Sequence, residues 1–219
     1  LKAEALLMLL PLMVSVYYKE NILYVYGIVI GLILAVGTLM TMPKPETKTI
    51  YAREGFAIVS LSWIFMSVFG ALPFVISGAI PSFVDALFET VSGFTTTGAS
   101  ILSNIEALPK SLLFWRSFTH WIGGMGVIVF VLAILPKKEM QSMHILRAEV
   151  PGPTVGKLVS KATVTARILY IIYTVLTIAE IISLLCCKIP LFDSVTTAFA
   201  TAGTGGFSVK NTSIAAYDN

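Results

Sequence analysis

Five apolar segments, each close to the length that crosses a bilayer, recur along this chain. They cover residues 3–18, 22–42, 55–76, 112–135 and 168–187. A membrane-spanning helix needs about 20 apolar residues, and only the first segment, which Pro11 interrupts, is clearly shorter. Charged residues make up 12% of the 219, about half of the roughly 25% that is typical of soluble domains. The pattern predicts an all-α polytopic membrane protein.

The stretch Asp85–Ser100 lies between the third and fourth apolar segments and is too short and too polar to cross the bilayer. Its first part predicts a short amphipathic half-helix. Thr95–Ser100 predicts an extended loop, because β-branched threonine disfavours a helix and Gly98 permits unusual backbone angles. Non-helical backbone at membrane depth is tolerated only where protein buries it or where it lines a water-filled path. The stretch is therefore a candidate re-entrant helix followed by an ion-selective pore loop.

The same pattern occurs again 108 residues later, after the fifth apolar segment. Asp85 aligns with Asp193, and the string TTGAS at 96–100 aligns with TGGFS at 204–208. Each copy places its aligned glycine thirteen positions after the aspartate. We interpret Asp85 and Asp193 as the N-caps of two half-helices, which aim the partly negative ends of the helices at the loops. The chain is predicted to contain an internal repeat.

Backbone carbonyls of the two loops are the candidate cation ligands, because a ring of carbonyls can replace the water around a monovalent ion. The predicted ligands are Thr96, Thr97, Gly98, Thr204, Gly205 and Gly206. The residues predicted to flank them are Thr95, Ala99, Ser100, Gly203 and Phe207. A tight re-entrant turn, in which glycine and threonine serve only helix packing, is the alternative interpretation.

Two ionisable residues are predicted to support the first loop. Glu89 lies on the first half-helix and Arg116 enters the next span on the same side. We interpret them as a pair that braces the loop rather than as direct ion ligands. His120 is interpreted as a packed histidine, and the glycines within 123–126 as a site of close helix packing or of a bend.

Positive charge predicts the orientation in the membrane. Ten of the fifteen basic residues lie at the N-terminus, in the loop 43–54 and in the region 136–167. Because basic residues are enriched in cytoplasmic loops, these regions are predicted to be cytoplasmic and both pore loops to face outside. The net charge of +3 is small, and no basic cluster alternates with aromatic residues, so nucleic-acid binding is not indicated.

Four strings together resemble the Trk/Ktr/HKT superfamily of potassium transporters, and most closely its TrkH-type members. They are TTTGAS at 95–100, HWIGGMGVIV at 120–129, RAEVPGP at 147–153 and TAGTGGFS at 201–208. The resemblance implies two N-terminal spans followed by four potassium-channel-like repeats of span, pore helix, filter loop and span. It implies K⁺ as the transported ion, with no organic cofactor. Ala99-Ser100 and Phe207-Ser208 stand where potassium channels have Tyr-Gly, which implies looser selectivity.

The resemblance also implies an organisation and partners. Residues 1–54 would hold the two N-terminal spans, 55–135 the first repeat, 136–166 a cytoplasmic loop and 167–219 an incomplete second repeat. The chain ends at Asn219 without a helix to close that repeat, so about half of a four-repeat pore is expected. The implied partners are a cytosolic TrkA-like nucleotide-binding ring at the loop 136–166, a second copy in a homodimer, and the lipid of a bacterial inner membrane.

The function expected from these features is potassium uptake through a gated pore, with coupling to Na⁺ or H⁺ left open. Channel or symport mechanism, K⁺ or Na⁺ preference and the gating ligand are left open too. A polytopic membrane enzyme is the alternative from another class, and a purely structural membrane subunit is a third. The sequence contains no HExxH string, and His120 and His144 are not spaced with carboxylates as metal ligands. We therefore expect a transporter subunit rather than an enzyme.

Overall fold

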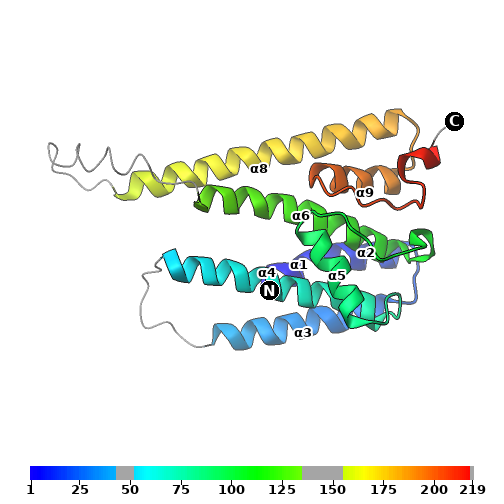
Figure 1. The fold of residues 1–219 in the computed structure, drawn as a ribbon, viewed down its shortest axis with the longest axis horizontal. Helices are drawn as coiled ribbons and strands as arrows, with labels where there is room; N and C mark the ends of the chain where they lie inside the picture. Colours follow the sequence, from blue (N-terminus) through cyan, green and yellow to red (C-terminus); the bar gives the residue numbers. More distant parts are fainter. Residues whose placement is uncertain (43–51, 135–154, 218–219) are drawn as a thin grey trace.

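The computed structural model describes residues 1–42, 52–134 and 155–217, and these ranges form helices joined by turns, with no strands. Long helices lie side by side along the long axis of the molecule (Figure 1). The helices are α1 Lys2–Leu7, α2 Leu9–Tyr17, α3 Leu23–Thr41, α4 Ala52–Ile76, α5 Phe83–Phe94, α6 Lys110–Ile134, α8 Val155–Cys186 and α9 Leu191–Ala202, with short 3₁₀ turns η1 Ile105–Ala107 and η2 Ser213–Tyr217. The predicted all-α class is confirmed.

Three helices in the described ranges of the chain are long and apolar enough to span a membrane. Their spans are Leu23–Thr41, Glu54–Ile76 and Val164–Cys186, with a mean hydropathy of 2.0 to 2.2. They correspond to the second, third and fifth predicted spans. α6 occupies the place of the fourth, and the first half of this helix carries buried polar side chains such as Arg116 and His120.

The first predicted span is divided. α1 ends at Leu7 and α2 begins at Leu9, so neither helix reaches the length of a span. Pro11 has no N–H to donate to the carbonyl of Leu7, and its ring crowds that carbonyl. Proline therefore explains why residues 3–18 form two short helices rather than one.

The region predicted as a long cytoplasmic loop is only partly described. Residues 136–154, which include the RAEVPGP string, lie outside the described residues, as does most of the loop 43–54. α8 begins at Val155, well before the predicted start of the fifth span at residue 168. No glycine or proline follows Gly156 within this helix, so nothing in its sequence breaks it at that point.

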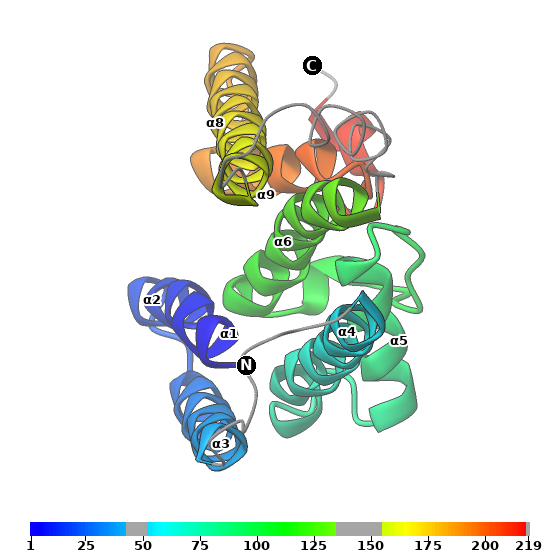
Figure 2. The same cartoon turned by 90° about the vertical axis from the view of Figure 1, so that its left-hand side faces the viewer.

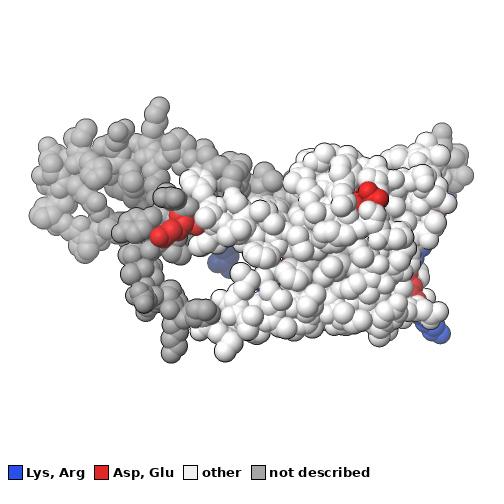
Figure 3. Space-filling model, turned by 60° about the horizontal axis from the view of Figure 1, so that its bottom comes forward, with Lys and Arg blue, Asp and Glu red and all other residues white. Residues whose placement is uncertain are grey.

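The outer surface is strongly apolar. Between residues 164 and 186 of α8, only 6% of the most apolar window is buried, and side chains such as Ile171, Val175 and Leu176 are exposed. Figure 3 shows one face of the molecule on which charged side chains are few. Exposed apolar area of this extent is typical of a surface that faces lipid or another membrane helix.

α6 lies at the centre of the helices that the structure describes. It packs against α2, α5, α8 and α9, and Figure 2 shows it between the N-terminal helices and the α8–α9 pair. Trp115 is fully buried, and its indole N–H donates to the carbonyl of Gly70 in α4 over 2.9 Å. Glu20, in the turn before α3, accepts hydrogen bonds from the N–H and hydroxyl of Ser111 at the start of α6. The N-terminal helices are thereby fixed to the helix that reaches both candidate loops.

Candidate functional site

α5 and α9 are matched helices. Each has twelve residues, and each bound of α9 lies 108 positions after the corresponding bound of α5. The turn that ends α5 places Thr96 at φ 56° and Gly98 at φ 74°, and the turn that ends α9 places Thr204 at φ 61° and Gly206 at φ 81°. The backbone therefore repeats position by position, which confirms the internal repeat predicted from the sequence.

The positive φ of the two threonines was not predicted, because a β-branched residue rarely adopts this conformation. The same hydrogen bonds hold both turns in place. The N–H of Thr97 donates to the carbonyl of Ser92, and that of Gly205 to the carbonyl of Ala200, each over 3.0 Å. Bonds that reach back five residues are typical of helix ends that close on a left-handed residue, usually glycine. Strain of this kind is concentrated at functional sites.

The two loops meet through their backbones. A Cβ added at Gly98 would overlap the carbonyl oxygen of Gly205, so these residues, 107 positions apart in the sequence, are in direct contact. Thr97, Thr204 and Gly206 are exposed, whereas Thr96, Gly98 and Gly205 are partly buried. The structure thus brings the predicted ligands of both loops together and leaves one side of the pair accessible.

Some of the flanking residues predicted from the sequence are exposed and others are buried. Thr95 is exposed, and its hydroxyl lies 2.8 Å from that of Thr97. Ala99 and Ser100 are exposed as well, while Gly203 and Phe207 are buried against the protein.

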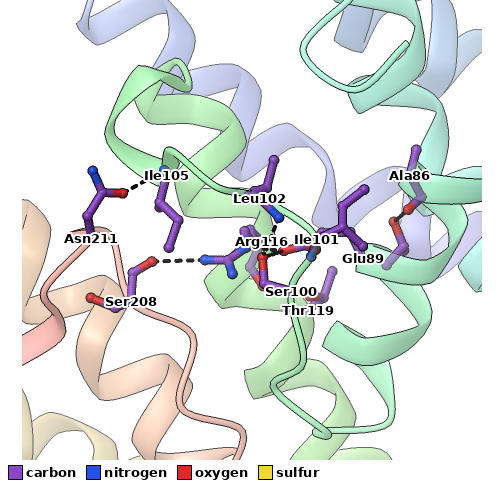
Figure 4. Close-up of polar contacts among 11 residues, drawn as sticks. Ala86, Glu89, Ser100, Ile101, Leu102, Ile105, Arg116, Thr119, Ser208 and Asn211 are labelled. Carbon is purple, nitrogen blue, oxygen red and sulfur yellow. Dashed lines mark hydrogen bonds and ion pairs between the residues drawn. The ribbon is translucent and has the colours of Figure 1, made fainter. Parts of the chain in front are cut away.

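Glu89 holds the first loop. The residue is 1% exposed, and its carboxylate accepts from the hydroxyl of Ser100 over 2.9 Å and from the N–H of Ile101 over 3.1 Å. Arg116, 2% exposed, donates its Nε–H to the same carboxylate over 2.5 Å. Figure 4 shows these groups converging from α5, α6 and the chain that follows the first loop. The predicted pair of Glu89 and Arg116 is confirmed.

Arg116 also holds the second loop, which sequence reasoning did not predict. Its guanidinium donates to the carbonyl oxygen of Ser208 over 2.8 Å and lies 3.6 Å from the centre of the Phe207 ring. A buried guanidinium with carboxylate, carbonyl and aromatic partners is satisfied in several directions at once. One buried ion pair therefore connects the chain after the first loop with the chain after the second (Figure 4).

The predicted N-caps were wrong. α5 begins at Phe83 with Ser82 as its N-cap, and the Ser82 hydroxyl accepts from the N–H of Asp85 over 3.4 Å. α9 begins after Pro190, which has no side chain able to cap it. Asp193 is buried and accepts from the hydroxyl of Tyr217 over 2.7 Å. Both helices begin two residues before their aspartate, so each carboxylate lies in the first turn, where the helix dipole still favours it.

The glycines of α6 allow close packing, as predicted. A Cβ at Gly123 would overlap the carbonyl oxygen of Phe94 at the end of α5, and one at Gly126 would lie 2.7 Å from the Trp63 ring. On α5, a Cβ at Gly93 would overlap the Thr119 hydroxyl. α6 therefore lies directly against the end of the first half-helix.

The segments that follow the two loops are also joined to each other. Asn211 accepts from the N–H of Ile105 over 2.8 Å, donates its own N–H to Glu106 over 3.2 Å and donates its amide to Asn104 over 3.1 Å. Lys210 lies 3.5 Å from the Glu106 carboxylate. The Asn211 N–H, followed by the charge of Lys210, holds the pKa of Glu106 below its usual range.

The fold is that of a polytopic membrane protein in which two matched short helices, α5 and α9, end at loops that touch each other. The model of the family TrkH, described as cation transport protein, matches residues 24–219. The chain belongs to the TrkH family of cation transport proteins.

Named relatives agree with this assignment. The chain is 35% identical to the Trk system potassium uptake protein TrkH of Halomonas elongata and 38% identical to the Trk system potassium uptake protein TrkG of Escherichia coli, each match covering 98% of this chain and 45% of the relative. The crystal structure of the potassium transporter TrkH from Vibrio parahaemolyticus matches with a TM-score of 0.83 at 32% identity, over 100% of this chain and 44% of that one. The chain thus spans about half the length of the relatives that it matches.

Proposed function

We propose that this chain supplies two of the loops that bind K⁺ in a potassium-uptake pore of a bacterial inner membrane. The observation that carries the proposal is the contact between Gly98 and Gly205, which joins two loops of matching backbone conformation. The relatives named as potassium uptake proteins support the choice of ion.

In this proposal the ligands are the backbone carbonyls of Thr96, Thr97 and Gly98 in the first loop and of Thr204, Gly205 and Gly206 in the second. Carbonyl oxygens compensate a monovalent cation for the water it loses. α5 and α9 end at these loops, and the partly negative C-terminal end of each helix favours a cation there. The Glu89–Arg116 pair positions the loops and does not bind the ion.

The organisation inferred from the family resemblance belongs to the proposal. The loops face outside, and the N-terminus and the region 136–166 face the cytoplasm, where a nucleotide-binding regulatory ring would bind. Residues 55–135 and 167–219 act as two pore repeats, preceded by the two N-terminal spans within residues 1–54. A gated pore, Na⁺ or H⁺ coupling and a homodimer are further expectations from the same resemblance.

Uptake of ⁸⁶Rb⁺, a K⁺ substitute, into proteoliposomes containing the full-length protein tests the proposal. Wild type should accumulate Rb⁺, and K⁺ should compete. Gly98→Asp should abolish uptake, because the residue has a positive φ and any side chain there would overlap the Gly205 carbonyl. Gly31→Ala is the matched control, since nothing lies within 4 Å of its added Cβ.

The control should transport like wild type, and both variants should insert into membranes. Normal Rb⁺ uptake by the Gly98→Asp protein would contradict the proposed ligand set. Absence of uptake by wild type would contradict the proposed function itself.

A further inference from the structure

His120 lies one helical turn beyond Arg116 on α6 and is fully buried. Its ring centre is 4.0 Å from that of Phe207, and neither ring nitrogen makes a hydrogen bond of good geometry within the described part of the chain. A buried polar group without a partner costs folding free energy, so its presence needs a specific explanation. Packing alone would be better served by an apolar side chain.

The neighbour of the His120 ring is Gly205 in the second loop. A Cβ added at Gly205 would overlap the imidazole at Cδ2 and Nε2. Gly205 does not share the positive φ of Gly206, so its backbone conformation does not require glycine. The equivalent residue in the first loop is Thr97, which carries a full side chain and is exposed. The imidazole therefore explains why the second loop has glycine where the first has threonine.

The backbone of His120 touches the same loop. A Cβ added at Gly203 would overlap the His120 carbonyl oxygen. Gly203 and Gly205 lie on either side of Thr204, the residue held at φ 61°. His120 thus contacts both neighbours of the strained threonine, one through its carbonyl and one through its ring.

We propose that His120 is a positioning residue that fixes how far the Thr204–Gly205 backbone stands from α6, and thereby sets the discrimination of this site between K⁺ and smaller cations. The inference rests on the proposed function, in which the carbonyls of this loop bind K⁺. An interior packed at native density transmits small displacements rather than absorbing them. Removal of the ring allows the loop to move toward α6 and changes the spacing of its carbonyls.

Two measurements on the full-length protein test the inference. The first is a double-mutant cycle of unfolding temperature in detergent with Gly205→Ala, His120→Ala and both together. Gly205→Ala should lower the unfolding temperature of the otherwise unchanged protein, and the loss should be much smaller when His120 is already alanine, because the added methyl group then enters the vacated space. Equal losses in the two backgrounds would overturn the inference, and this result does not depend on transport.

The second measurement is ⁸⁶Rb⁺ uptake with Na⁺ as competitor. His120→Ala should reduce the discrimination against Na⁺ by about tenfold, which corresponds to about 1.4 kcal/mol, and adding Gly205→Ala should restore some of it. Gly126→Ala is the control, since the three atoms nearest to its added Cβ all belong to Trp63, the closest at 2.7 Å, and none belongs to the second loop. It should lower stability without changing discrimination.

The outcomes separate the two proposals. If wild type takes up no Rb⁺, the proposed function fails, and the stability cycle still decides whether His120 and Gly205 are coupled. If wild type takes up Rb⁺ and His120→Ala discriminates against Na⁺ as wild type does, the inference about His120 fails alone.

Discussion

The two loops share one backbone conformation, but different regions of the chain hold them. The first loop is fixed within its own repeat, by Glu89 of the preceding half-helix. The second is fixed from the other repeat, by Arg116 and His120 of α6. Its own half-helix has Thr197 where the first has Glu89. The loops are therefore not two independent copies, because the second depends on a helix that belongs to the first repeat.

Removal of the buried ion pair should have the largest effect and should separate the two loops. Arg116→Gln leaves the Glu89 carboxylate buried without its cationic partner, and breaking such a pair costs about 3–5 kcal/mol. Glu89→Gln should cost a similar amount. The double variant E89Q/R116Q should lose less than the sum of the two, because neither remaining group is then an unpaired charge.

Amide hydrogen exchange in detergent shows which loop is released by each variant. Glu89→Gln should increase exchange mainly at residues 97–103, whereas Arg116→Gln should increase it at both 97–103 and 205–211. Equal protection of residues 205–211 in the Arg116→Gln and wild-type proteins would mean that α6 does not hold the second loop.

Replacing the strained threonines, Thr96 and Thr204, by glycine should have a smaller effect on stability than removing the ion pair. The effect should differ between the two loops. A residue other than glycine in the left-handed conformation costs about 1–2 kcal/mol of folding free energy. Replacement by glycine removes this cost, but the greater chain entropy of glycine in the unfolded state offsets about 0.5–1 kcal/mol of the gain. Thr204 is exposed, whereas the Thr96 methyl lies against Gly123. Thr204→Gly should therefore raise the unfolding temperature slightly, and Thr96→Gly should leave it unchanged or lower it. A larger gain from Thr96→Gly would reverse the comparison.

Acid should weaken the contacts of Glu106 with Lys210 and Asn211, which join the segments that follow the two loops. We expect this to have the smallest effect on stability. The pKa of Glu106 is lowered in the folded protein, so its contribution to stability is present above the unfolded pKa of about 4.3 and is lost as pH falls through the folded value. The carboxylate is exposed, so solvent screens the effect. Unfolding temperatures between pH 7 and pH 3 should fall slightly more for wild type than for Glu106→Gln. Parallel curves would show that this link does not couple the segments.

The sequence predicted the elements of the fold because hydropathy and the internal repeat are local patterns. The shift of 108 residues located α9 from α5, and the charges of Glu89 and Arg116 within apolar surroundings indicated a pair. The reach of Arg116 to Ser208 could not be predicted, because nothing in the sequence places α6 against a loop 92 residues away. The N-caps were misplaced since an aspartate is favoured in the first turn of a helix as well as at its cap.

The conformation of Thr96 and Thr204 is the clearest case in which the hydrogen bonds that close a helix end outweigh the preference of the residue type. Thr96 and Thr204 have positive φ, as do the aligned glycines Gly98 and Gly206 two residues further on. A signal was present in retrospect, because both copies have Thr at the same place before their glycine. The residue type argues against a positive φ at threonine. Only the repetition of threonine at the same place in both copies could have indicated this conformation.

Anomalous diffraction from crystals of the full-length protein grown in RbCl would show whether the two loops bind the ion together, because it locates the ion without relying on transport rates. We predict a Rb⁺ peak beside the contact between Gly98 and Gly205, with carbonyl oxygens of residues 96–98 and 204–206 as its nearest protein ligands. A peak coordinated by side chains elsewhere, or loops separated so that no ion touches both, would contradict the account.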